Sequence, residues 1–237
     1  MSGLYVADVG NTRIKWASVE RLDEVSAVRE DESDWERTLP AGAGHWTIAS
    51  VRPGRSQHLA NWLRERGHAV TLIERPEQIP LAVDLEHPER VGVDRLLNAL
   101  AVRSRLLPGE SAALIDAGSA VTVDLLEAGH TFRGGAIFPG LDLMAQALHG
   151  YTALLPAVTI TLPVPRLPGR STVPALQAGI YAAVVGGIKE CLSVYDASRV
   201  FLTGGQAAVL SAALPKATVW PGMTLAGVAA LVREGRS

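Results

Sequence analysis

The stretch LYVADVGNTRIKWAS, residues 4–18, contains the pattern from which the fold can be predicted. An apolar run from Leu4 ends at the carboxylate of Asp8, Gly10-Asn11 follows as a turn signal, and the segment from Ile14 to Ser18 alternates in polarity. Such a succession is typical of two antiparallel strands joined by a tight turn. We therefore predict a strand, a turn and a second strand at the start of the chain.

The same pattern returns at ALIDAGSAVTVDLL, residues 113–126. Asp8 and Gly10 correspond in it to Asp116 and Gly118. Because further strands and helices are expected after each copy, the simplest interpretation is a duplication, with two similarly built lobes and a cleft between them. The two matching aspartates are then expected to face each other.

Between the two copies, the sequence predicts mixed α/β structure. We expect strands at His45–Val51 and Val70–Glu74, and helices at Arg55–Arg66 and Val91–Leu107. Pro108-Gly109 ends the last of these, so the lobes are placed at residues 1–110 and 111–237. In the second lobe we expect strands at Thr131–Phe138 and Val200–Thr203, helices at Leu141–His149 and Val173–Tyr195, a proline-rich connection at Pro156–Pro168, and two further helices flanking Thr218–Trp220.

Composition favours small-molecule chemistry. The 237 residues carry a net charge of −2 with both signs mixed along the chain, so no broad basic face for nucleic acid or anionic lipid is expected. Cys191 has no cysteine partner, and the six histidines show no metal-binding spacing, so we expect neither an internal disulfide nor a transition metal. The apolar run Ala175–Ile188 is shorter than the ~20 residues of a membrane span. No secretory signal is recognised, and cytoplasmic residence is expected.

The segment Asp8–Thr12 has the residue types that a phosphate chain requires. Glycine permits close approach of backbone N–H groups, hydroxyl and amide side chains complete the hydrogen bonding, and a carboxylate holds magnesium or its waters. Alone, the segment is more typical of an ordinary hairpin turn than of a phosphate-binding loop. The second copy at Asp116–Ser119, and a further glycine turn at Thr203–Gly205, favour the nucleotide interpretation.

These residues, with their order and spacing, resemble the type III pantothenate kinase family, a branch of the superfamily of acetate and sugar kinases, Hsp70 and actin. The resemblance covers nearly the whole chain and is most specific at Gly92–Arg95. It is carried by five motifs: Asp8–Thr12, Gly92–Arg95, Asp116–Thr122, Gly134–Gly140 and Thr203–Gly205. It implies duplicated ribonuclease H-like, actin-like ATPase lobes with a nucleotide cleft between them. It also implies ATP-dependent phosphorylation of pantothenate to 4'-phosphopantothenate, the first step of coenzyme A biosynthesis.

The resemblance assigns the proton acceptor to Asp94, which would take the proton of the substrate's primary hydroxyl. An acid in the first turn of a helix is also favoured by the helix dipole, so a structural role stays open. Arg95 would bind the pantothenate carboxylate or the transferring phosphoryl group, or be a surface charge. Thr172 matches a pantothenate contact and is also a candidate N-cap. Leu85 stands where members often have an aromatic substrate contact.

The remaining assignments also follow from the resemblance. Asp116 would bind a monovalent cation, K+ or NH4+, and Asp8 would hold Mg2+ directly or through water. Ser119 replaces the usual threonine and keeps its hydroxyl. The residues assigned to ATP and its phosphates are Asp8, Val9, Gly10, Asn11, Thr12, Arg13, Ile14, Lys15, Ser119, Thr203, Gly204 and Gly205. The residues assigned to the substrate are Leu85, Gly92, Val93, Asp94, Arg95 and Thr172.

Members of the family are usually homodimers, and the resemblance implies that this protein is a homodimer too. The apolar run Ala175–Ile188 could provide the dimer surface, but burial within a single chain explains the run equally well. Two other functions are open at this point. One is a kinase or phosphatase of the same superfamily with another acceptor, which fold alone does not exclude. The other is a nucleotide-binding transcriptional accessory factor without catalysis, although no basic recognition helix or arginine-rich arm supports direct DNA binding.

Overall fold

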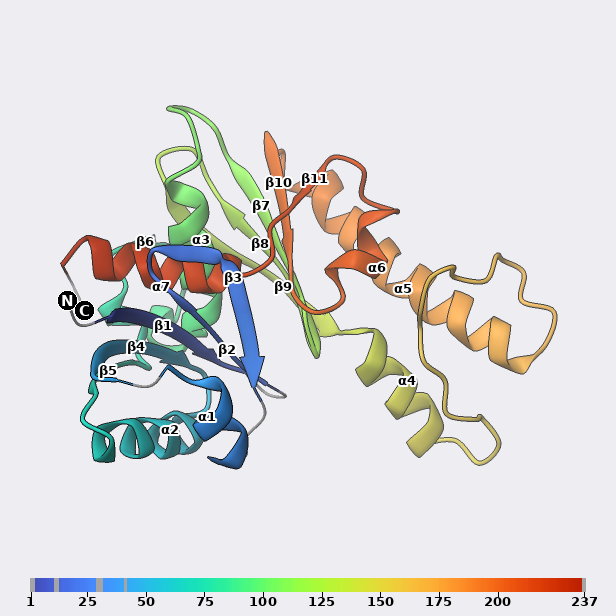
Figure 1. The fold of residues 1–237 in the computed structure, drawn as a ribbon. Coiled ribbons are helices and arrows are strands. Elements are labelled where there is room, and N and C mark those ends of the chain that lie inside the picture. The colour runs from blue at the N-terminus through green and yellow to red at the C-terminus, as the bar shows by residue number, and fades with distance from the viewer. Residues whose placement is uncertain (1–2, 11–12, 29–31, 41, 236–237) are drawn as a thin grey trace. The chain divides into compact units, whose positions relative to one another are not determined.

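The computed structural model describes residues 3–10, 13–28, 32–40 and 42–235 (Figure 1). The predicted phosphate-binding residues Asn11 and Thr12 lie outside these ranges. The chain packs as two compact units. The first comprises Met1–Leu107, His130–Phe132 and Gly222–Ser237, and the second comprises Pro108–Gly129 and Arg133–Pro221.

The first unit is built on a five-stranded sheet in the order β3-β2-β1-β4-β5. The strand β1 pairs antiparallel with β2 and parallel with β4, β2 pairs antiparallel with β3, and β4 pairs parallel with β5. The strands are β1 (Gly3–Val9), β2 (Ile14–Ser18), β3 (Arg21–Val28), β4 (Gly44–Ser50) and β5 (Ala69–Ile73). The short strand β6 (Ala82–Val83) pairs with Thr131 and Phe132.

Helices cover both faces of this sheet, as Figure 1 shows. One face is covered by α1 (Glu32–Thr38) and α2 (Pro53–Glu65), and the other by α3 (Val93–Arg103) and α7 (Met223–Arg233). Two short 3-10 turns, Pro76–Gln78 and Pro88–Arg90, lead towards α3. The α3 and α7 helices are joined by a buried hydrogen bond from Thr224 to Asn98, 2.9 Å between the side-chain oxygens. The C-terminal helix therefore belongs to the first unit, although it lies in the range assigned from the sequence to the second lobe. The division of the chain at residue 110 stays a prediction.

The second unit repeats the strand order of the first. Its strands run β9-β8-β7-β10-β11, which matches β3-β2-β1-β4-β5 position by position. They are β7 (Ala112–Ala117), β8 (Ala120–Leu126), β9 (Thr131–Pro139), β10 (Arg199–Thr203) and β11 (Ala217–Val219). The pair β7–β8 is antiparallel, and β10 is parallel to both β7 and β11. Its helices are α4 (Leu141–Gly150), α5 (Thr172–Val194) and α6 (Ala207–Ser211).

The predicted duplication and the α/β fold class are therefore confirmed. Asp8 is the second-last residue of β1 and lies opposite Lys15, while Asp116 is the second-last residue of β7 and lies opposite Thr122. The predicted strands and helices are found with ends shifted by a few residues. The sequence analysis missed β3, α1, β6 and β11. Among the described helices, none combines the length and apolar character that a bilayer-spanning segment requires.

Candidate active site

One candidate phosphate-binding segment lies at the end of β1, in the first unit. The N–H of Gly10 donates to the carbonyl of Arg13, 3.1 Å away. From α2, Nη1 of Arg55 donates to the carbonyl of Gly10 at 2.8 Å. The buried hydroxyl of Ser50 donates to the carbonyl of Val9 at 3.4 Å and accepts from the N–H of Arg52 at 2.8 Å. The turn is thus supported by side chains that the sequence analysis missed.

The residues assigned to ATP in this segment differ in what they can offer. Asp8 and Lys15 are half-buried and opposite each other in the strand pair, and the side chain of Arg13 is exposed. Val9 and Ile14 are buried in the core of the first unit. Any contact of these two residues with a nucleotide must therefore come from their backbone.

Asp94 and Arg95 lie in the first turn of α3. Gly92 is the N-cap residue, Val93 is buried, and both charged side chains are half-buried. A carboxylate oxygen of Asp94 accepts a hydrogen bond from the N–H of Arg95 at 2.9 Å. A carboxylate has about four lone-pair sites, of which this hydrogen bond uses one.

The guanidinium of Arg95 lies 5.6 Å from the centre of the Phe132 ring. A cation over an aromatic face at this distance is attracted by the ring, so Arg95 is not a freely solvated surface charge. Leu85, also in the first unit, is half-buried and follows Asp84, whose N–H donates to the carbonyl of Phe132 at 3.0 Å. Phe132 thus lies near both Arg95 and the segment that contains Leu85.

Another candidate phosphate-binding segment is the β7–β8 turn, in the second unit. Asp116 is half-buried, Ser119 is exposed, and the N–H of Gly118 donates to the carbonyl of Ala120 at 3.0 Å. This turn is packed against two other glycine segments of the same unit. The N–H of Gly140 donates to the carbonyl of Ser119 at 2.9 Å, and the N–H of Gln206 donates to the carbonyl of Ala117 at 2.9 Å.

Only glycine fits at two of these positions. Gly204 has φ of 97°, a left-handed conformation, and a Cβ atom there would collide with the backbone of Ala117. A Cβ atom at Gly140 would collide with the backbone carbonyls of Gly118 and Ser119. The turns at Gly118 and Gly204, predicted to act together, are therefore in contact, and Gly140 joins them.

The sequence analysis gave no role to Gln206, yet this residue links all three segments. Its backbone contacts Ala117, and its side-chain oxygen accepts from the N–H of Leu141 at 3.0 Å. The contacts of Gln206 join segments that are far apart in the sequence, so no local sequence pattern indicates them.

Thr172 is distant in the sequence from these glycine segments and forms none of the hydrogen bonds described above. It is the first residue of α5 and is exposed, while the N-cap position belongs to Ser171, which makes no side-chain capping bond. The alternative role of Thr172 as an N-cap is thus not found.

The described carboxylates suit a cation that is shared with phosphates. Within the described ranges, no group of three or more His, Cys, Asp or Glu side chains could hold a metal alone. Mg2+ commonly uses one or two carboxylates together with substrate phosphates and waters. Single half-buried carboxylates at the ends of β1 and β7 fit that mode of binding.

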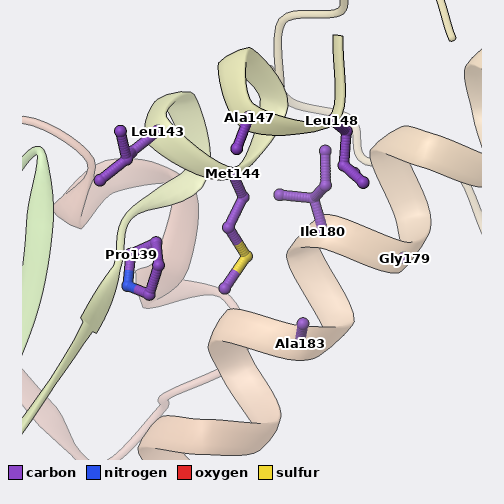
Figure 2. Close-up of a pocket in the computed structure, with 8 residues that line it drawn as sticks. All are labelled: Pro139, Leu143, Met144, Ala147, Leu148, Gly179, Ile180 and Ala183. Atoms are coloured by element: carbon purple, nitrogen blue, oxygen red, sulfur yellow. The ribbon is translucent and has the colours of Figure 1, made fainter. Parts of the chain in front are cut away.

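An apolar groove lies elsewhere in the second unit, between α4 and α5. Figure 2 shows Met144 and Leu148 from α4 and Ile180 from α5 pointing toward one another. The groove has a volume of about 330 Å³, and its lining is completed by Pro139, Leu143, Ala147, Gly179 and Ala183. Its lining offers no charged side chain for a phosphate.

The fold is shared with proteins of solved structure. A protein described as a Baf family transcriptional activator from Campylobacter jejuni matches with a TM-score of 0.68 and 19% identity, covering 98% of both chains. A protein described as a 2-dehydro-3-deoxygalactonokinase from Sinorhizobium meliloti matches with a TM-score of 0.59 and 14% identity, covering 98% of both chains. Together with the duplicated sheets, these matches show the fold of actin-like ATPases and sugar kinases.

Within that class, sequence comparison shows the family. The model of the type III pantothenate kinase family matches residues 4–193. A type III pantothenate kinase from Rhodopirellula baltica is 38% identical over 176 residues, which is 71% of this chain and 63% of that protein. The chain belongs to the type III pantothenate kinase family.

Proposed function

We propose that this protein transfers the γ-phosphoryl group of ATP to the primary hydroxyl of pantothenate, giving ADP and 4'-phosphopantothenate. The observation that carries the proposal is the family match over residues 4–193, which includes Gly92–Arg95 at the start of α3 and the turn that contains Asp116. The relative from Rhodopirellula baltica is named a type III pantothenate kinase, and the duplicated fold supports a nucleotide-dependent kinase.

Asp94 is proposed as the proton acceptor. The hydroxyl oxygen of pantothenate forms a bond to the γ-phosphorus, the bond from that phosphorus to the β,γ-bridging oxygen breaks, and the hydroxyl proton passes to a carboxylate oxygen of Asp94. Arg95 offers a guanidinium to the pantothenate carboxylate or to the phosphoryl oxygens. Its position beside Phe132 restricts the side chain and so reduces the entropy that binding would cost.

Each of the two turns is proposed to bind phosphate groups or their cations. Asp8 would hold Mg2+ directly or through water, and Asp116 would hold K+ or NH4+. A cation at these positions neutralises phosphate charge that otherwise repels the attacking hydroxyl. Ser119 and the segment Thr203–Gly205 complete the proposed ATP contacts.

One assay tests the proposal. Purified protein is incubated with ATP, magnesium and pantothenate, with and without potassium, and phosphopantothenate is measured alongside ADP. Parallel reactions contain sugars, acetate or no acceptor. We expect phosphopantothenate formation that depends on pantothenate and increases with potassium or ammonium. Equal ADP release without an acceptor would identify a phosphatase, and turnover with another acceptor would identify a different kinase.

We also propose that the protein is a homodimer in the cytoplasm, without a nucleic-acid or membrane partner. The groove between α4 and α5 supports a partner surface, because its lining is apolar and Leu143 beside it is exposed. Light scattering should give twice the mass of 25.1 kDa. Ala183→Glu, which puts a charge in the groove, should give a monomer, whereas Ala212→Glu on exposed surface should not. A monomeric wild-type protein would contradict the dimer.

A further inference from the structure

Gln206 uses only one end of its side-chain amide in the described structure. The oxygen accepts from the N–H of Leu141 at 3.0 Å. A backbone N–H only donates, so the acceptor end of the amide must face Leu141 and the amino group must point the other way. Among the residues that the structure describes, no hydrogen-bond partner is found for that amino group. The side chain is half-buried, so its two N–H donors remain accessible.

The position of Gln206 within the second unit indicates what its two N–H donors can contact. Its backbone is bonded to Ala117 at the β7–β8 turn, and it directly follows Thr203–Gly205. Its side-chain oxygen caps the start of α4, where the N-cap residue Gly140 has no side chain of its own. Gln206 is thus fixed where the two proposed nucleotide turns of this unit meet.

A phosphate chain suits this place. The turns present glycine backbone, and the first turn of a ten-residue helix carries the positive end of the helix dipole. Oxygen atoms of a phosphate accept hydrogen bonds and donate none at neutral pH, so they match the amino group of Gln206.

From these contacts we infer that Gln206 is an ATP-binding residue whose side-chain amino group donates a hydrogen bond to a phosphate oxygen, while its oxygen holds α4 against the β7–β8 turn. The inference rests on the proposed binding of ATP by this unit. The side chain would thus bind phosphate through its amino group and hold α4 through its oxygen, and substitutions can test these two roles separately.

Gln206→Glu is the informative variant. The carboxylate still accepts from the N–H of Leu141, so the contact between the segments is kept, but both N–H donors are lost and a negative charge is added. Titration calorimetry with magnesium and a non-hydrolysable ATP analogue should show affinity lower by about tenfold to a hundredfold, the usual value of a hydrogen bond to a charged group. ADP should weaken similarly. Adenosine affinity, the melting temperature and KM for pantothenate should stay close to wild type.

Two further variants complete the design. Gln206→Met removes both tasks and should lower the melting temperature as well as the ATP affinity. Gln57→Glu makes the same change on the exposed face of α2, where the amide bonds only Asn61 at 2.7 Å, and should leave nucleotide binding unchanged.

Wild-type affinity of Gln206→Glu for the ATP analogue would overturn the inference and leave Gln206 as a structural cap. Equal weakening of adenosine would overturn it too, because the effect would then not act through phosphate. Because binding is measured without an acceptor, a failure of pantothenate phosphorylation by the wild-type protein would be recognised separately.

Discussion

The two turns that follow β1 and β7 occupy the same place in equivalent sheets, but they are supported in different ways. At the first turn, the carbonyls of Val9 and Gly10 are bonded by the side chains of Ser50 and Arg55. At the second turn, the carbonyls are bonded by backbone N–H groups of neighbouring glycine and glutamine segments. The two units therefore share the same strands, but the hydrogen bonds that hold their turns differ. Substitution of Ser50 or Arg55 should weaken the hydrogen bonds of the first turn, whereas a Cβ atom added at Gly140 or Gly204 should disrupt the packing of the second.

The largest expected effect concerns one of two acids that each stand in the first turn of a helix, one in each unit. Asp94 lies in the first turn of α3 and Asp142 in the first turn of α4. Asp94→Asn removes the proposed proton acceptor and should lower kcat by about two to four orders of magnitude, while binding of ATP persists. Steady-state kinetics with pantothenate, together with nucleotide binding, measure this. Asp142→Asn changes the same helix position in the second unit and should stay near wild type. Unchanged turnover in Asp94→Asn would remove Asp94 from the mechanism.

The second turn should tolerate no side chain at Gly204. Gly204→Ala combines a left-handed backbone, which costs about 1–3 kcal/mol for a residue with a Cβ, with overpacking against Ala117, which costs about 1–3 kcal/mol more. Urea unfolding should show a free-energy loss within the sum of these ranges. Gly205→Ala next to it is a matched control, because a Cβ there meets no atom within 4 Å. Similar stability of the two variants would contradict the close packing of the second turn.

The comparison also shows what a sequence can reveal. The paired strands around Asp8 and Asp116 were predictable because alternation and a carboxylate before a glycine turn are local signals. The side chains that hold the turns were not predictable, because Arg55 bonds a residue 45 positions away in the sequence and Gln206 bonds one 65 positions away. Nor was β3, an edge strand that begins with Arg21, Asp23 and Glu24 exposed and shows no apolar alternation. Contacts between segments that are distant in the sequence produce no periodic pattern of residue types.

At the first turn, a side chain is expected to set nucleotide affinity. Arg55→Met keeps the length of the side chain and removes the hydrogen bond to the carbonyl of Gly10. Loss of a charged hydrogen bond should raise KM for ATP by about tenfold with a smaller effect on kcat. Arg64→Met, on the exposed surface of the same helix, is the control. If both variants have the KM of the wild type, the support of the first turn does not matter for ATP.

The smallest expected effect concerns pH, to which the two units should respond differently. In the second unit, burial, followed by Cys191 and Asp124, raises the pKa of Tyr195 to about 12, and its hydroxyl donates to the carbonyl of Val123 at 3.1 Å. In the first unit, burial lowers the pKa of His68, and Nδ1 of His68 accepts from the N–H of Gly44 at 3.1 Å.

The direction of each effect follows from which state binds the proton more readily. Below about pH 6.5 the unfolded chain protonates His68 more readily than the folded chain does, so the free energy of unfolding falls as the pH drops through that value. Tyr195 has the opposite effect, with stability lost only as the pH rises above about 10. Urea unfolding of the wild type and of His68→Gln, at about pH 7.5 and about pH 5.5, measures the first effect. Glutamine keeps an acceptor for Gly44 and does not titrate, so the stability difference between the two proteins should depend on pH. A difference that stays constant between those two values would show that His68 is equally basic in the folded and unfolded chain.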